Sequence, residues 1–345
     1  MNPASQLRDK RQIASVGAEG SRSKAPVFVL GCGRSGTKLL YHTLLSAGGF
    51  AVYHAESNAF NLIGVRFGNL ARRENRRVLL DHWLRSKLFH RTGLSREEIE
   101  PRILEECRNA GDFLRILMET IARKQGVQRW AECTPLHLLY LPLIKKLLPD
   151  ALIVHIIRDG RDVAVSLDRI GWIKPFSWDG KRKLLAPAIF WKWIVSKGRR
   201  YGSRMGADYL EVHYEDVVEK PQEALARIGD FIEHDLDYDR IRQVGVGSVS
   251  APNTSFHDGP PGGFSPTGRW KEGYSPANLA VFEGLVGQTL KELGYELGTK
   301  DPHVLDRTDL RRIRGTYMKY FDSKLFLKTK MPLRRLVITR DLSWI

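Results

Sequence analysis

Short apolar runs and stretches of helical periodicity alternate along this chain. The run APVFVL (25–30) is β-prone and ends in a glycine-rich turn, and the next residues place Leu40 and Leu44 at helical spacing. A second unit repeats the plan, because ALIVHII (151–157) is typical of a buried strand and is followed by a turn, RDGRD, and a helical pattern, VAVSLDRI. Two strand–turn–helix units predict an α/β fold of three layers, with a mainly parallel central sheet flanked by helices.

The rest of the chain shows further helical, strand and loop patterns. Residues from about 63 to 148 are mostly helical in pattern, and residues 209–232 predict a strand, an acidic turn and a helix with Pro221 near its start. Residues 245–268 are dense in glycine, proline and serine, which is typical of a functional lid or a disordered loop. The chain after about residue 300 is basic, and a solvated surface is favoured there over a clamp for an acidic partner.

Composition sets limits on the class of protein. No run approaches the roughly 18 apolar residues of a membrane span, and the start of the chain has no apolar secretory core. The three cysteines predict neither a disulfide framework nor a metal site, so a reduced, cytoplasmic protein is expected. The net charge of +16 favours an anionic partner, which could be a polyphosphate, an acidic substrate, nucleic acid or a membrane surface.

The turn GCGRSGTK (31–38) nearly matches the phosphate-binding loop G-x-x-x-x-G-K-[ST], but Thr37 and Lys38 stand in reversed order. A glycine-rich turn between a strand and a helix offers backbone N–H groups and the positive end of the helix dipole to an anion. Arg34 adds a guanidinium suited to phosphate or sulfate oxygens, and Ser35 and Thr37 add hydroxyl donors. The loop therefore predicts a dianion site that needs no metal, within a P-loop-like fold.

The segment VFVLGCGRSGTKLL resembles the 5'-phosphosulfate loop of sulfotransferases, which use 3'-phosphoadenosine-5'-phosphosulfate (PAPS) as donor and release 3',5'-adenosine bisphosphate (PAP). The segment VHIIRDGRDVAVSL (154–167) resembles the second anchor of that family, which implies that Arg158 and Ser166 hold the 3'-phosphate. An arginine at the carboxyl end of a strand and a hydroxyl on the next helix can converge on one anion. For the first loop, the resemblance implies donor contacts from Gly33, Arg34, Ser35, Gly36, Thr37 and Lys38.

Further matches extend the resemblance over about residues 26–295. In VHYEDVVEKPQEALARI, Tyr214 is similar to a tyrosine near the nucleotide, although a packed tyrosine is equally consistent with the pattern. GRWKEGYSP resembles the segment that closes over the donor, which implies phosphate contact or adenine stacking by Arg269, Trp270 and Lys271. The expected organisation is a flexible basic segment (1–25), a sulfotransferase domain (26–298) and a basic tail (299–345) that packs on or extends the domain.

The resemblance also implies a general base and an in-line transfer. In AVYHAESN (51–58), Glu56 falls where related bacterial and protein-tyrosine sulfotransferases have a glutamate at the end of the next strand, and His54 is the alternative base. Arg34 is expected to act on the transferred group as well. RWAECTPLHLLY resembles a bacterial W-x-E-K-T-P segment, but Cys133 replaces the lysine. Either Arg34 and a neighbouring lysine, Lys38 or Lys271, supply that charge, or activity is weakened. His137 is a candidate to face the acceptor.

The acceptor has no motif of its own. The bacterial-type motifs favour a carbohydrate, glycolipid or natural-product hydroxyl over a peptide tyrosine, and the basic charge allows an anionic acceptor and peripheral contact with a membrane. Neither nucleic acid nor a metal ion is expected, and the oligomeric state is left open. The alternatives are a magnesium-dependent P-loop kinase, which would need lysine directly after Gly36, and a basic polyanion-binding protein without catalysis.

Overall fold

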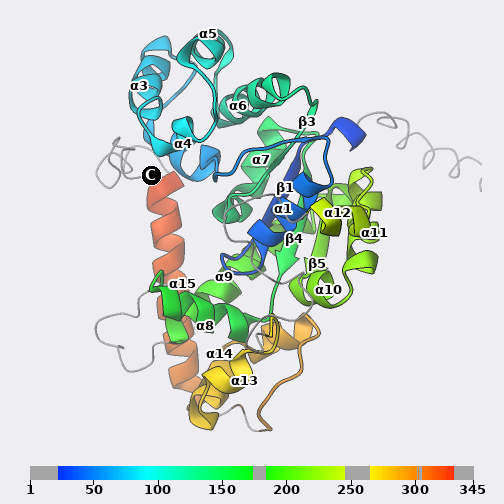
Figure 1. The fold of residues 1–345 in the computed structure, drawn as a ribbon. Coiled ribbons are helices and arrows are strands. Elements are labelled where there is room, and N and C mark those ends of the chain that lie inside the picture. The colour runs from blue at the N-terminus through cyan, green and yellow to red at the C-terminus, as the bar shows by residue number, and fades with distance from the viewer. Residues whose placement is uncertain (1–21, 174–183, 245–264, 301, 303–304, 330–345) are drawn as a thin grey trace, which may run out of the picture.

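A five-stranded parallel sheet forms the centre of the computed structural model, which describes residues 22–173, 184–244, 265–300, 302 and 305–329 (Figure 1). The strand order is β2-β3-β1-β4-β5, and each neighbouring pair is parallel. The strands are β1 (Val27–Gly31), β2 (Phe50–Ala51), β3 (Arg129–Glu132), β4 (Leu152–Ile157) and β5 (Tyr209–His213). The α/β class and the parallel sheet predicted from the two apolar runs are confirmed.

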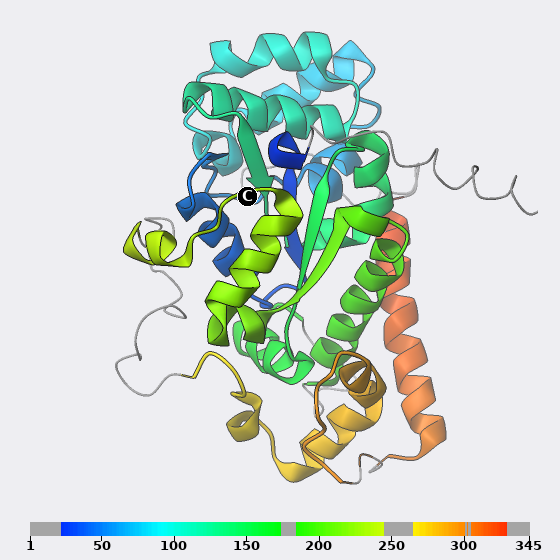
Figure 2. The ribbon, with the colours of Figure 1, turned by 90° about the vertical axis from the view of Figure 1, so that its right-hand side faces the viewer.

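Helices connect these strands and cover both faces of the sheet (Figure 2). None of the described helices combines the length and the apolar character needed to cross a lipid bilayer. The α-helices are α1 (Thr37–Ser46), α2 (Gly64–Arg66), α3 (Arg73–Trp83), α4 (Lys87–His90), α5 (Arg96–Glu106), α6 (Ala110–Lys124), α7 (Leu141–Leu147), α8 (Gly160–Ile170), α9 (Leu185–Gly202), α10 (Tyr214–Glu219), α11 (Pro221–Ile232), α12 (Tyr238–Val244), α13 (Trp270–Gly273), α14 (Pro276–Glu292) and α15 (Arg307–Thr329). Short 3₁₀ segments are η2 (Arg22–Lys24), η4 (Pro135–Tyr140) and η6 (Gly206–Asp208), and η3 (Ala59–Ile63) is a π-helical turn.

The alternation of side chains along β1 separates the two halves of the core. Val27 and Val29 pack with α1, α11 and α12, whereas Phe28 and Leu30 pack with the larger cluster that includes α6 and α9. All of these side chains are fully buried, so the sheet is covered on both faces, as a parallel sheet requires. A run that is apolar at every position, such as VFVL, is the expected signature of this arrangement.

The pairing of β1 with β4 brings the two predicted anchors to one edge of the sheet. Gly31 ends β1 opposite Ile156 of β4, so the turns that follow both strands start side by side. The backbones are close there, because a Cβ atom on Gly31 would lie 2.4 Å from the carbonyl oxygen of Ile156. Glycine at this position is therefore a packing requirement as well as the start of the anion-binding turn.

Two features differ from the sequence-based expectation. The stretch from about 63 to 148 is mostly helical, as predicted, but β3 lies within it. Strand β2 ends at Ala51, so Glu56 lies in the connection to η3 and does not end a strand as predicted. Parts of three predicted segments lie outside the described residues. They include residues 1–21 of the N-terminal segment (1–25), residues 245–264 of the glycine- and proline-rich loop, and residues 330–345 of the tail.

Candidate functional site

The first element of the site is the turn between β1 and α1. Gly36 has φ +89° and precedes α1, and Arg34 has φ +75°, a conformation that is uncommon for a residue with a side chain. The ring of Tyr214 covers Gly36 so closely that a Cβ atom there would lie 2.3 Å from Cδ2 of the tyrosine. Tyr214 thus lies against the turn, and it is buried.

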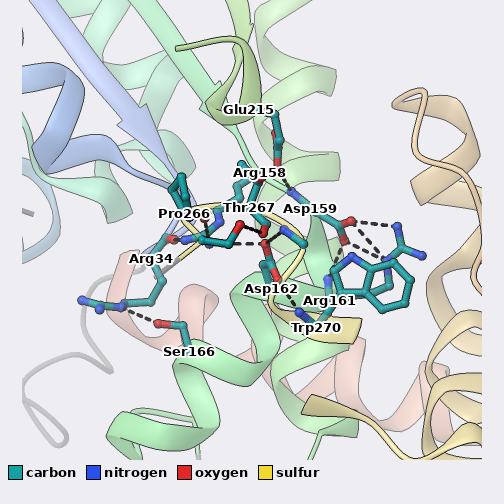
Figure 3. A network of polar contacts seen from close by, with 12 residues as sticks. Arg34, Arg158, Asp159, Arg161, Asp162, Ser166, Glu215, Pro266, Thr267 and Trp270 are labelled. Atoms are coloured by element: carbon teal, nitrogen blue, oxygen red, sulfur yellow. Dashed lines mark hydrogen bonds and ion pairs between the residues drawn. The ribbon is translucent and has the colours of Figure 1, made fainter. Parts of the chain in front are cut away.

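The second element joins the first through a direct contact (Figure 3). Arg34 Nε lies 2.9 Å from Ser166 Oγ and donates a hydrogen bond to it, although the two residues are 132 positions apart. Ser166 lies on α8, which begins immediately after β4. The two anchors recognised in the sequence are therefore in contact in the folded chain.

Arg158, which follows β4, lies between the turn and the segment before α13. Its Nη1 donates to the carbonyl oxygen of Arg34 at 3.3 Å, and its Nη2 donates to the carbonyl oxygen of Pro266 at 2.7 Å and to Asp162 at 3.3 Å (Figure 3). The guanidinium carbon lies 4.4 Å from the centre of the Tyr214 ring. These contacts fix a largely buried arginine at the carboxyl edge of the sheet.

Asp162 ties the segment before α13 to α8. Its carboxylate accepts hydrogen bonds from the backbone N–H groups of Gly268 at 3.1 Å and Trp270 at 2.8 Å. The indole of Trp270 lies over Arg161, with 3.8 Å between the guanidinium carbon and the ring centre, and Arg161 is paired with Asp159. The segment GRWK is therefore held beside the two anchors by buried charges.

The arginines of this site repel one another. Burial lowers the pKa of Arg34, and the charges of Arg158 and Arg269 lower it further. Among the described residues, Ser35 Oγ and Arg158 Nε are buried polar atoms with no hydrogen-bond partner. A bound polyanion fits this arrangement. It would offset the repulsion between the three guanidinium groups and accept hydrogen bonds from the two buried donors.

Glu56 lies at a cavity of about 350 Å³ that also borders Gly33 of the turn. Burial raises the pKa of Glu56, and the charge of Lys38 opposes that shift. Its carboxyl group is therefore protonated more readily than a carboxyl group in water. His54 is exposed and lies next to His42, with 6.5 Å between the ring centres, and it does not line this cavity.

Behind this cavity lies a buried polar cluster around Glu132, a residue not singled out from the sequence. Its carboxylate accepts hydrogen bonds from Ser57 Oγ at 2.7 Å, from the backbone N–H of Thr134 at 3.1 Å and from His137 Nδ1 at 3.0 Å. His137 is fully buried in this cluster, which contradicts the expectation that it faces an acceptor, because its ring is needed to satisfy the Glu132 carboxylate. The sequence pattern W-x-E contains Glu132 and could have pointed to this cluster.

Cys133, Lys38 and Lys271 differ in their exposure and in their relation to Glu56. Cys133 is buried, its pKa is raised by burial, and it is hydrogen-bonded with Thr37 of the turn. Lys38 is exposed at the start of α1, and its charge acts on both Glu56 and Cys133. Lys271 is exposed on α13, and its charge is not among those that shift the pKa of Glu56. No group of three or more potential metal-ligating side chains occurs in the described part of the chain.

Solved structures similar to this chain were found. The sulfotransferase domain from the curacin biosynthetic pathway has a TM-score of 0.50 and 15% identity, and the match covers 79% of this chain and 98% of that domain. Sulfotransferase STF9 from Mycobacterium avium has a TM-score of 0.46 and 15% identity, over 86% of this chain and 82% of that one. Mouse sulfotransferase SULT7A1 in complex with PAP has a TM-score of 0.42 and 15% identity, over 79% and 87% respectively. The likeness to the curacin domain confirms the fold.

Sequence comparison gives the family. Among curated proteins no significant match was found. The family model described as "Sulfotransferase family" matches residues 26–238, a region that contains both anchors, Glu56 and Tyr214. Since that region is more than half of the 345 residues, the resemblance drawn from the two loops is confirmed, and the chain belongs to the sulfotransferase family.

Proposed function

We propose that the protein transfers the sulfuryl group of PAPS to a hydroxyl acceptor by in-line displacement, without a metal ion. The observation that carries the proposal is the contact between Arg34 and Ser166, which joins the two predicted donor anchors. Arg158 and Arg269 add positive charge to the same place. The 3'-phosphate and 5'-phosphosulfate of PAPS carry negative charge that would balance the positive charge of these arginines.

Different residues of the chain bind the two ends of the donor. Arg158 and Ser166 hold the 3'-phosphate, and the turn from Gly33 to Lys38 holds the 5'-phosphosulfate through backbone N–H groups, Arg34 and the two hydroxyl groups. The unpartnered Ser35 Oγ and Arg158 Nε support this division, because each is a buried donor that a phosphate or sulfate oxygen would satisfy. Contacts of Tyr214, Arg269, Trp270 and Lys271 with the nucleotide stay a prediction from the resemblance.

Glu56 acts as the general base. As the acceptor oxygen forms its bond to sulfur and the bond between sulfur and the 5'-phosphate oxygen breaks, the hydroxyl proton passes to the Glu56 carboxylate. The position of Glu56 at a cavity that also borders Gly33 supports this role, because the base must lie between donor and acceptor. His54, the alternative base, is exposed and away from that cavity.

Lys38 supplies the positive charge that Cys133 cannot. The charge of Lys38 acts on Cys133 and on Glu56, so it lies near both the substituted position and the base. The charge of Lys271, the other candidate, is not among those that shift the pKa of Glu56. Arg34 and Lys38 together would balance the charge that develops on the leaving 5'-phosphate.

The acceptor is a hydroxyl of a carbohydrate, glycolipid or natural product by the resemblance, with peptide tyrosine as the less favoured class. An anionic acceptor, peripheral membrane contact and a cytoplasmic location also stay predictions. The division into residues 1–25, 26–298 and 299–345 is likewise a proposal, and the structure adds that α15 packs against α9 and α14.

The test is the thermal shift of the purified protein with PAP, magnesium ATP and 5'-AMP. A shift with PAP that is much larger than with 5'-AMP is expected, because only PAP carries the second phosphate. Arg158→Ala and the more conservative Arg158→Lys should both reduce it, whereas Arg169→Ala, at an exposed arginine of the following helix α8, should not. A shift with magnesium ATP alone would favour the kinase alternative and overturn the proposal.

A further inference from the structure

The cavity that Glu56 borders is mainly apolar. Of the 14 residues that line it, five are aromatic and only Glu56 and Lys324 are charged. Its volume of about 350 Å³ lies within the range of small-molecule sites, which is roughly 300 to 1,000 Å³. A carbohydrate in such a cavity would leave most of its hydroxyl groups without partners, at a cost of about 1 to 3 kcal/mol for each buried group.

The cavity is continuous with the donor turn. Gly33 lines it, and the indole of Trp172 lies against that glycine, since a Cβ atom on Gly33 would be 3.2 Å from Cζ3 of the tryptophan. Trp172 is 64% exposed, so its apolar surface is available at the cavity. A hydroxyl placed at Glu56 therefore lies next to the turn that is proposed to hold the phosphosulfate, while the rest of the acceptor lies among apolar side chains.

Helix α15 forms one wall of this cavity through Phe321, Lys324 and Leu325. The ring of Phe321 stacks on Trp193 of α9 with 5.5 Å between centres, and Trp193 Nε1 donates to Asp322 at 3.0 Å. Asp322 is also paired with Lys197 at 2.9 Å. These contacts fix the wall on α9, and Figures 1 and 2 show α15 running along the outer side of the molecule.

The wall lies outside residues 26–238, the part of the chain that the family model matches. The donor half of the site is built within the matched region, whereas Phe321, Lys324 and Leu325 come from the C-terminal helix. Lys324 is exposed and lies over the ring of Tyr320 on the same helix, at 4.2 Å from its centre. Within the described ranges it has no ion pair, so its ammonium group is available to an acceptor.

We propose that the acceptor is an apolar, ring-containing alcohol that carries an anionic group, with its hydroxyl at Glu56, its body against the aromatic side chains and its anion at Lys324. The inference rests on the proposed function and narrows its acceptor class. The aromatic side chains, which include Phe190 and Trp193 of α9, favour a flat ring over a flexible chain. Lys324 adds selectivity for the anionic form of such an alcohol.

The test measures binding to the protein saturated with PAP, by calorimetry, for three probes. These are 2-naphthol, 6-hydroxy-2-naphthoate, which is the same ring with a carboxylate, and glucose as a polyhydroxylated compound. Both naphthols should bind and glucose should not, and the carboxylate should improve affinity by about two- to fivefold, as expected for a partly exposed ion pair. Lys324→Gln should remove that advantage without changing the affinity for 2-naphthol, whereas Lys319→Gln, an exposed lysine on α15 outside the cavity, should keep it.

A second variant tests the apolar lining of the cavity at a residue outside the core. Leu136 lines the cavity and is 36% exposed, so Leu136→Glu should fold, keep its affinity for PAP and lose binding of both naphthols. Binding of glucose in preference to the naphthols, or an equal effect of Lys324→Gln and Lys319→Gln, would overturn the inference. Failure to bind PAP would instead overturn the proposed function, so the two failures are distinguishable.

Discussion

Arg34 and Ser166 are joined by a hydrogen bond of 2.9 Å from Nε to Oγ, across 132 residues of sequence. One belongs to the turn after β1 and the other to the helix after β4, and β1 and β4 are neighbours in the sheet. The Ser166 hydroxyl, which is itself proposed to bind the 3'-phosphate, therefore orients the guanidinium group of Arg34. Substitution at either residue should therefore weaken binding of the whole donor.

Ser166→Ala should weaken the affinity for PAP by about 10- to 100-fold, because a hydrogen bond to a charged group contributes about 1.5 to 3 kcal/mol. Alanine is favourable in a helix, so the fold should be unaffected. Calorimetric titration with PAP measures the change. Arg169→Ala on the same helix is the matched control, and equal affinities for the Ser166→Ala variant and the wild type would remove Ser166 from the donor site.

Glu56→Gln should lower kcat by about 100- to 10,000-fold while leaving the affinity for PAP unchanged, because the amide keeps the shape of the side chain but takes no proton. Single-turnover measurement with PAPS and an accepted alcohol gives the rate of the chemical step. His54→Gln is the comparison and should retain most of the activity. The reverse result, with activity lost only in His54→Gln, would assign the base to His54.

Lys38→Met should move the acidic limb of the kcat–pH profile to higher pH. The proposed base must be ionised, burial raises the pKa of Glu56, and the charge of Lys38 is the largest of the influences that lower it. Loss of that charge raises the pKa further, so a larger fraction of the base is protonated at a given acidic pH. The readout is the position of the limb, which a simple loss of folding would not move.

Cys133 stands where related sulfotransferases have a lysine, and both Lys38 and Lys271 are candidates to supply that positive charge. Lys271→Met tests which of the two does so. Lys271 does not act on the pKa of Glu56, so the limb should stay in place in this variant. A shift of the limb in Lys271→Met and none in Lys38→Met would assign the charge near the base to Lys271.

The donor half of the site could be predicted from the sequence because its signals are local. The apolar runs mark β1 and β4, and the residues that follow each strand stay at its carboxyl end in any parallel sheet. Strand β3 was missed because it is short and begins and ends with charged residues. Arg129 and Glu132 are nevertheless buried, since Arg129 donates to the carbonyl oxygens of Ala25 and Ile232 and the Glu132 carboxylate is fully hydrogen-bonded.

The acceptor half could not be predicted because no short segment contains it. Phe190 and Trp193 lie on α9, Phe321 and Lys324 on α15, and more than one hundred residues separate the two helices. In the sequence these aromatic residues are indistinguishable from core, and Trp193 is in fact 4% exposed. Only the packing of α15 on α9 shows that their edges form the wall of a cavity.

His155 provides a test of the core that is independent of the proposed activity. It lies on β4, is fully buried, and its Nδ1 donates to the Tyr209 hydroxyl at 2.6 Å, because that hydroxyl donates its own hydrogen to Glu211. Its Nε2 has no partner in the described part of the chain. Burial lowers the pKa of His155 to about 3. An unfolded histidine has a pKa of about 6.5, so between these values the unfolded chain binds a proton that the folded chain does not.

The free energy of unfolding should therefore fall as the pH is lowered below about 6.5, with His155 contributing up to about 1.4 kcal/mol per pH unit at the steepest part. His155→Asn retains an N–H donor for Tyr209 and cannot titrate, so its stability should fall less steeply over the same range. Denaturant unfolding at a series of pH values from 7 to 5 measures both slopes. His90→Asn, at an exposed histidine, should keep the wild-type slope, and a wild-type slope in His155→Asn would show that other groups control the acid sensitivity of the fold.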